Sequence, residues 1–211
     1  MKKPSIKSEI LREEAAHSNN TGRTSLYGAA VEYGIHCMVW LIEPRTKPVS
    51  SRDLAELQGV PTTLMARIMP RLEKAGLVVS TSGISGGYRL AKEPKDITVL
   101  DIADAIDGRK SVFDCKDIRK NCVLFGGEAP AWMTRGVCGV HAVMLRAEKS
   151  MRNEMDRTTL QDLSTGFSVL APADFGEDIG QWLDNRATNR ELARISAVKD
   201  SSRNRRRGSD G

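Results

Sequence analysis

The apolar positions between residues 26 and 43 recur at three- and four-residue steps, which is the spacing of one face of an α-helix. Five side chains share that face: Leu26, Ala30, Tyr33, Cys37 and Leu41. Pro44 ends the run, because proline cannot continue a helix. The pattern predicts a mostly buried helix over residues 26–43, with Cys37 in the core.

Two shorter helices are predicted next. Val49–Gly59 has inward-facing leucines, an N-cap at Ser50 or Ser51, and a closing glycine. A second helix begins near Pro61 and ends at Gly76. Such a pair is a helix-turn-helix, whose second helix presents its N-terminal residues to the DNA major groove. We expect DNA contacts here from six residues: Ser51, Arg52, Thr62, Thr63, Arg67 and Arg71.

A glycine-rich hairpin is predicted after the second helix. The flanks LVVS and YRLA enclose a glycine-rich tip, which is typical of two strands joined by a turn. This hairpin is the wing, and its expected DNA contacts are Ser82, Ser85, Gly86, Gly87 and Tyr88. Helices and hairpin in this order predict a mainly α fold with a small β-wing, the winged helix-turn-helix. The alternative is a mixed packing element that does not bind DNA.

A long amphipathic helix is predicted over residues 140–163. Its apolar stripe consists of Val140, Met144, Ala147, Met151 and Met155, with charged residues on the flanks. The stripe indicates either a core-facing helix or a dimerisation helix.

The charge of the chain is concentrated in its tails. The net charge is +5, of which residues 1–24 and 187–211 together supply +6, so the central body is about −1. Residues 50–92 nevertheless carry an excess of +3, in the segment predicted to bind DNA. The N-terminus has no apolar run that could act as a signal peptide or membrane span, which predicts a cytoplasmic protein without membrane contact.

Catalysis is not expected. The sequence offers no nucleophile and base pair, no phosphate-binding loop and no substrate motif, so we expect neither an enzyme nor a small-molecule substrate.

Three cysteines and a histidine stand close together in the sequence, as Cys115, Cys122, Cys138 and His141. In a reducing cytosol such thiols are more often ligands or redox switches than disulfides, so they indicate a metal or an iron–sulfur cluster. Glu32 and His36 stand four residues apart on one helical face. That pair is either a buried acid–imidazole hydrogen bond or a pair of metal ligands.

Four segments, YGIHCMVWLI, DLAELQGVPTTLMARIMPRLEKAGLV, SGISGGYRLAK and ITVLDIADAIDG, resemble the IscR/NsrR/RsrR family of winged-helix regulators. The resemblance spans about residues 25–163 and implies a homodimeric transcription factor that binds an operator in double-stranded DNA. Many members carry an iron–sulfur cluster that reports iron supply, redox state or nitric oxide. The family uses the long helix for dimerisation.

The resemblance also implies which residues bind the cluster. Cys115 matches the first ligand, Cys122 the middle cysteine, and Cys138-Gly-Val-His141 the closing C-x-x-H. Fifteen residues separate Cys122 from Cys138, where the family has a short spacer. Glu32 and His36 match a pair that RsrR-type members contribute from the other subunit, so they compete with His141 for the fourth position. The resemblance to RsrR-type members thus implies a 2Fe–2S in preference to a 4Fe–4S cluster. Mixed ligation raises the reduction potential of a cluster and suits redox sensing.

The expected organisation has five regions. They are a disordered basic extension at 1–24, a DNA-binding domain at 25–110, a cluster-binding loop at 111–139, the dimerisation helix at 140–163, and a C-terminal extension at 164–211. The last is expected to be largely disordered, apart from a late helix within 175–195 that docks on the body. The predicted function is that of a repressor sensing redox or iron status. The alternatives are a zinc or thiol-switch regulator without iron, and an iron–sulfur electron carrier or protein-docking module.

Overall fold

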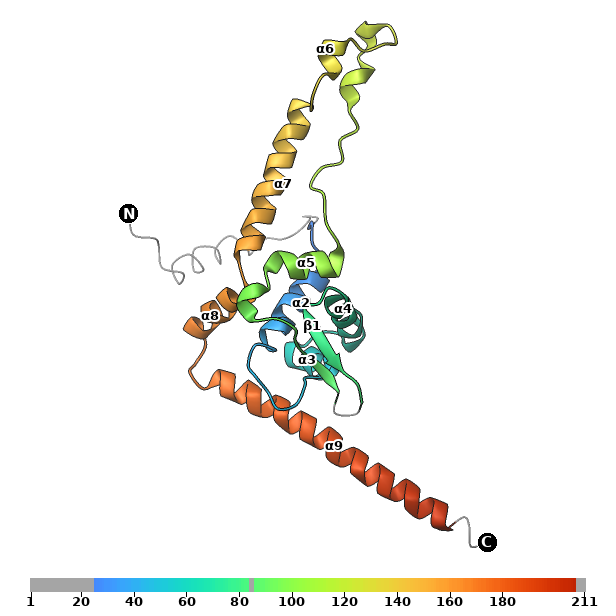
Figure 1. Cartoon of the computed structure of the whole chain (residues 1–211), viewed down its shortest axis with the longest axis vertical. Coiled ribbons are helices and arrows are strands. Elements are labelled where there is room, and N and C mark those ends of the chain that lie inside the picture. Colours follow the sequence, from blue (N-terminus) through green and yellow to red (C-terminus); the bar gives the residue numbers. More distant parts are fainter. Residues whose placement is uncertain (1–24, 84–85, 208–211) are drawn as a thin grey trace.

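The computed structural model describes residues 25–83 and 86–207, with side chains described as far as Val198. It has three parts (Figure 1): a helical body, an arm that projects from one side of the body, and a long helix, α9 (Phe175–Arg207), that leaves the other side. The predicted N-terminal extension, residues 1–24, lies outside the described residues, as does Ser85, one of the predicted DNA contacts.

The body contains the predicted helix-turn-helix. Helix α3 (Ser51–Gln58) is capped by Ser50, whose hydroxyl oxygen accepts a hydrogen bond from the Asp53 backbone N–H at 3.1 Å. Gly59 ends α3 in the left-handed region, at φ 64°, which is why a glycine stands there. Helix α4 (Thr62–Lys74) follows Pro61 and packs on α3. The predicted order of caps and helices is confirmed.

The wing is an antiparallel pair of strands, β1 (Val78–Thr81) and β2 (Gly87–Leu90). β2 is also held on its other side, because Tyr88 and Val49 exchange backbone hydrogen bonds of 2.8 and 3.1 Å. The backbones approach so closely that a Cβ on Gly87 would lie 2.5 Å from the Val49 carbonyl oxygen. Only glycine fits there without displacing the backbone.

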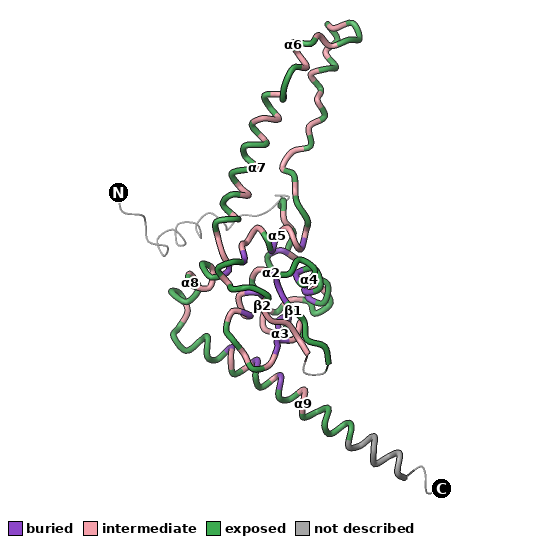
Figure 2. The backbone as a smooth tube through the Cα atoms, in the orientation of Figure 1, coloured by how far each residue is buried: buried purple, intermediate pink, exposed green. Residues whose placement is uncertain are grey.

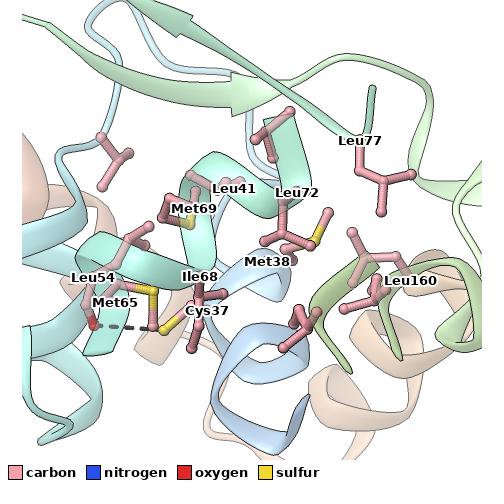
Figure 3. Packing of buried hydrophobic residues seen from close by; sticks show 14 of the residues in the cluster. Cys37, Met38, Leu41, Leu54, Met65, Ile68, Met69, Leu72, Leu77 and Leu160 are labelled. Carbon is pink, nitrogen blue, oxygen red and sulfur yellow. Dashed lines mark hydrogen bonds between the residues drawn. The ribbon is translucent and has the colours of Figure 1, made fainter. Parts of the chain in front are cut away.

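The core lies where α2 (Ala29–Val39), α3, α4 and α5 (Val99–Asp107) meet (Figure 3). Cys37 is fully buried among Met65, Ile68 and neighbouring apolar side chains, and its Sγ lies 3.8 Å from the Leu54 carbonyl oxygen. Burial raises the pKa of the Cys37 thiol to about 12. The prediction that Cys37 belongs to the core is therefore confirmed.

Two predicted helices have different bounds in the structure. The first helix, α2, is shorter than the predicted residues 26–43. It begins at Ala29 and ends at Val39, before Pro44 is reached. The long helix predicted over 140–163 is two helices, α7 (Gly139–Arg157) and α8 (Leu160–Leu170). Thr159 forms a capping box with Asp162, and this new helix start breaks the run that the apolar stripe had suggested.

The C-terminal extension is helical where disorder was predicted. α8 runs to Leu170, and α9 continues to Arg207. The early part of α9 is held because Ile179, Leu183 and Ala187 are buried against the body, as expected for a docked late helix. Composition could not reveal this docking, since its partners lie more than 100 residues earlier in the chain. No helix among the described residues is long and apolar enough to cross a membrane.

Candidate functional site

Helix α4, the second helix of the helix-turn-helix, has one face exposed along its length. Met65, Ile68, Met69 and Leu72 are buried, so the opposite face of the helix points to solvent. That face carries Thr62, Thr63 and Arg67, all exposed. Hydroxyl groups and a guanidinium in the first two turns of a helix are suited to contacts with base edges and phosphates.

The other predicted DNA contacts divide into exposed and anchored residues. Arg52 and Ser82 are exposed, while Ser51 and Gly86 are half-buried. Arg71 donates a hydrogen bond from its Nη1 to the Ile106 carbonyl oxygen, which ties α4 to α5. Two half-buried wing residues, Gly87 and Tyr88, line the contact between β2 and Val49. Burial, followed by the Glu73 charge, raises the pKa of the Tyr88 hydroxyl. Arg71, Gly87 and Tyr88 therefore help to hold the helix-turn-helix and the wing together as one unit, here called the reading head.

The arm consists of two limbs (Figure 1). The segment after α5 leads outward, with the short helices η2 (Ile118–Asn121), η3 (Val123–Phe125) and α6 (Ala131–Thr134) near the far end, and α7 runs back to the body. Residues 107–159 are all described, and none is buried (Figure 2). At the base of the arm, the Arg152 guanidinium donates two hydrogen bonds to the Asp104 carboxylate, at 3.1 and 2.7 Å. The arm is thus anchored on the body but has no core of its own.

The thiol of Cys138 stands at the N-terminal end of α7. The backbone N–H groups of His141 and Val140 donate hydrogen bonds to its sulfur and hold its pKa below the ordinary value of a thiol, and the nearby Arg119 charge acts in the same direction. A thiolate in this position is stabilised as a nucleophile or a metal ligand.

The two remaining arm cysteines lie on the opposing limb. Cys122 is the residue between η2 and η3, and Cys115 follows Phe113, whose ring centroid is 6.2 Å from that of His141. The two limbs are joined by Arg119, which binds Asp117 at 2.5 Å and the Gly136 carbonyl oxygen at 2.8 Å.

Glu32 and His36 lie on α2, in the body and not on the arm. Both side chains are exposed, so the interpretation of this pair as a buried acid–imidazole hydrogen bond is wrong. They line a hollow of about 570 Å³ that Tyr27, Val31 and Met155 of α7 also border. Side chains exposed on one helical face beside a hollow are accessible to a group brought by another molecule.

The predicted ligands are not assembled within one chain. Among the described residues, no three His, Cys, Asp or Glu side chains come together as a metal site. The donor types still fit an iron–sulfur cluster, because all three arm thiols are partly accessible and the Cys138 thiolate is favoured. The residues would hold it only after the limbs of the arm move together or a second chain supplies ligands.

Sequence reasoning missed a buried carboxylate. Asp53 on α3 is 1% exposed and accepts hydrogen bonds from Arg186 and Arg190 of α9, while Arg186 also binds Glu56. Arg186 and Arg190 stand four residues apart, beside the apolar positions of α9. This spacing places both on one face of the helix and was the one sign in the sequence that they contact a common partner.

Comparisons with known proteins agree with this architecture. A family model named Rrf2 and described as an iron-dependent transcriptional regulator matches residues 27–166. The protein rrf2 of Nitratidesulfovibrio vulgaris is 31% identical over 123 residues, covering 58% of this chain and 75% of that protein. The HTH-type transcriptional regulator IscR of Vibrio atlanticus is 35% identical over 144 residues, covering 68% and 76%.

Among solved structures, CymR, the global cysteine regulator of B. subtilis, is 24% identical and superposes with a TM-score of 0.50, covering 67% of this chain and 98% of that one. At this identity the likeness concerns the fold, and it confirms the winged helix-turn-helix. The IscR and NsrR relatives are named transcriptional regulators, not enzymes. The chain therefore belongs to the Rrf2 family of iron-dependent transcriptional regulators, which bind DNA.

Proposed function

We propose that this chain is a homodimeric repressor that senses redox or iron status through an iron–sulfur cluster, with a 2Fe–2S cluster favoured over 4Fe–4S. The observation that carries the proposal is the arm: three partly accessible thiols stand on a projection that contains no buried residue. A segment of more than 40 residues without a core needs a partner or a bound group to stabilise it.

Dimerisation is supported by α7. This helix has 19 residues and none of them is buried, although it carries the stripe of Val140, Met144, Ala147, Met151 and Met155. Val140 and the neighbouring Val143 are 63% and 53% exposed. Met155 packs against the core of the body, but the apolar side chains at the N-terminal end of α7 are left open to water, and we expect them to pack against a second copy of the helix.

The positions of the donors support a fourth ligand from the second subunit. Glu32 and His36 are exposed on the body, whereas the thiols are carried by the arm, which projects away from it (Figure 1). We propose that the Glu32/His36 pair meets the arm of the second subunit and supplies the fourth ligand there, beside the thiolates of Cys115, Cys122 and Cys138. His141, one turn beyond Cys138, is the competing fourth ligand from the same chain.

A bound cluster would supply a one-electron redox couple, whose potential rises as neutral imidazole replaces thiolate. The protein's part is to relay that state to DNA. α2, which carries Glu32 and His36, packs directly on α3, α4 and α5. A shift of α2 would therefore move the reading helices and alter the spacing between the two heads of a dimer, which operator binding requires to be fixed.

Two alternatives remain distinguishable. The same cysteines and histidine could bind zinc or switch through disulfides without iron, since such donors accept either metal. An iron–sulfur electron carrier or docking module would keep the cluster but not bind DNA, and membership of a regulator family argues against it.

The proposal is tested by an electrophoretic mobility-shift assay under anaerobic conditions, with a DNA fragment from the promoter region of the protein's own gene. We expect retardation whose apparent Kd differs at least about tenfold between the protein as purified and the same protein after removal of iron by a chelator. Equal affinity of both forms would contradict cluster sensing. Failure of both forms to bind any fragment of that region would favour the docking module.

A further inference from the structure

The C-terminal helix α9 lies beyond the part of the chain that matches the family, residues 27–166. Its first half is nevertheless built into the DNA-reading head. Ile179 and Leu183 are 6% and 3% exposed, and both belong to the hydrophobic core of the body.

Polar contacts fix α9 on helix α3. The Asp53 carboxylate is buried and accepts hydrogen bonds from Arg186 Nε at 3.3 Å and from Arg190 Nη1. Both arginines are at least half covered, at 37% and 28% side-chain exposure. A buried carboxylate that receives two guanidinium groups permits little sliding or rotation of the helix, because moving either arginine leaves a buried charge unpaired.

A second set of contacts joins α9 to the wing. Arg45 donates to the Gly180 carbonyl oxygen at 3.1 Å, and Lys47 binds Glu191 at 2.6 Å. The segment that carries Arg45 and Lys47 is itself held to β2, since Arg89 donates to the Thr46 carbonyl oxygen at 2.6 Å. α9 therefore has a defined direction relative to both the helix-turn-helix and the wing.

The distal half of α9, residues 192–207, continues as helix away from the body. In Figure 1 it points away from the arm, on the side of the molecule where the wing also points. At 1.5 Å per residue it extends about 24 Å. The sequence of this half contains six basic residues and a single acidic one, Asp200, whereas the body of the chain is about neutral.

We propose that the distal half of α9 is a second DNA-binding element, which contacts the phosphates next to the operator without reading their sequence. The fixed anchor on α3 and the wing carries this basic helix to the same DNA that the head binds. When arginines neutralise phosphates, counterions are released from the DNA, and this release favours binding at low salt. The element therefore adds affinity and salt dependence but no base preference. The inference rests on the DNA binding of the family and not on the cluster.

The test compares the full chain with R203Q/R205Q/R206Q/R207Q, which leaves the anchor at Asp53 intact. The DNA is a duplex selected by the wild-type protein from a random library, long enough to extend one helical turn beyond the operator on each side. The slope of log Kd against log salt is expected to fall by about 2 to 4, and affinity at physiological salt by about tenfold or more. On a duplex trimmed to the operator, the two proteins should bind alike.

The matched control is K2Q/K3Q/K7Q/R12Q, which removes the same charge from the N-terminal extension. It is expected to keep the wild-type dependence on flanking length. If the slope of log Kd against log salt fell equally in both variants, the effect would be one of net charge and the proposal would be overturned. An unchanged slope in the α9 variant, or a change in its oligomeric state instead, would overturn it as well.

Discussion

Arg190 on α9 donates a hydrogen bond to the buried carboxylate of Asp53 on α3, which lies 137 positions earlier in the sequence. This pair joins a C-terminal helix outside the family match to the first helix of the DNA-reading motif. The contact makes the extension part of the folded head, so its loss should affect more than the extension.

Removing both arginines should destabilise the protein strongly. R186A/R190A leaves Asp53 buried without a cation, and we expect the free energy of unfolding to fall by about 3 kcal/mol. In the D53A background the same two substitutions should cost less than about 1 kcal/mol, because no buried charge is stranded. Urea denaturation at constant m-value measures both. Equal losses in the two backgrounds would show that the arginines act independently of Asp53, and exposed Arg194→Ala is the control.

Gly87→Ala should displace the wing. A Cβ at this position would lie 2.5 Å from the Val49 carbonyl oxygen, and the clash is with backbone that cannot rotate away. We expect a loss of about 1 to 3 kcal/mol in unfolding free energy and weaker operator binding. Gly166→Ala is the matched control, since its Cβ meets nothing within 4 Å in the interior of α8 and should be neutral or slightly stabilising. Wild-type stability of Gly87→Ala would mean that the wing does not pack on Val49.

The four cysteines should react in two classes. Cys37 is fully buried, whereas Cys115, Cys122 and Cys138 are partly accessible. Brief treatment of the reduced, metal-free protein with iodoacetamide should therefore label three cysteines in the native state and the fourth only after unfolding. Peptide mass spectrometry identifies the sites. Labelling of native Cys37 at the rate of Cys115 would contradict its place in the core.

The helix-turn-helix and the wing could be predicted from the sequence because short stretches of residues determine them. The Ser50 cap, the Gly59 helix end and the glycine-rich wing each specify a conformation within a few residues. The break at Thr158–Thr159 and the docked α9 were not predictable in this way. The first depends on two backbone hydrogen bonds, from the Val99 N–H to the Thr158 carbonyl oxygen and from the Leu160 N–H to the Ile97 carbonyl oxygen. The second depends on a buried carboxylate far away in the sequence.

The sequence indicates which residues are candidate ligands but not how they are arranged in space. Spacing and residue type indicated the arm thiols, and the Glu32 and His36 pair was found from its helical periodicity and family resemblance. The exposure of both side chains, and the absence of an assembled metal site among the described residues, could be seen only in the folded chain. No sequence pattern states which chain completes a site shared between two subunits.

Substitution of single ligands should separate the two models for the fourth position. We expect Cys138→Ala to abolish the visible absorption of the cluster, and Glu32→Ala or His36→Ala to alter its spectrum or stability. Cys37→Ala is the matched control, which should keep the absorption because the thiol is in the core. If His141→Ala gives the larger change while both α2 variants retain the native spectrum, the cross-subunit arrangement is wrong.

We propose above that this member of the Rrf2 family carries an iron–sulfur cluster on its thiol arm. The most direct measurement is iron, sulfide and zinc analysis of anaerobically purified protein together with its visible absorption spectrum. We expect a coloured protein with iron and inorganic sulfide in equal amounts, about two of each per chain for the favoured 2Fe–2S cluster. A colourless protein with one zinc per chain and no sulfide would contradict it.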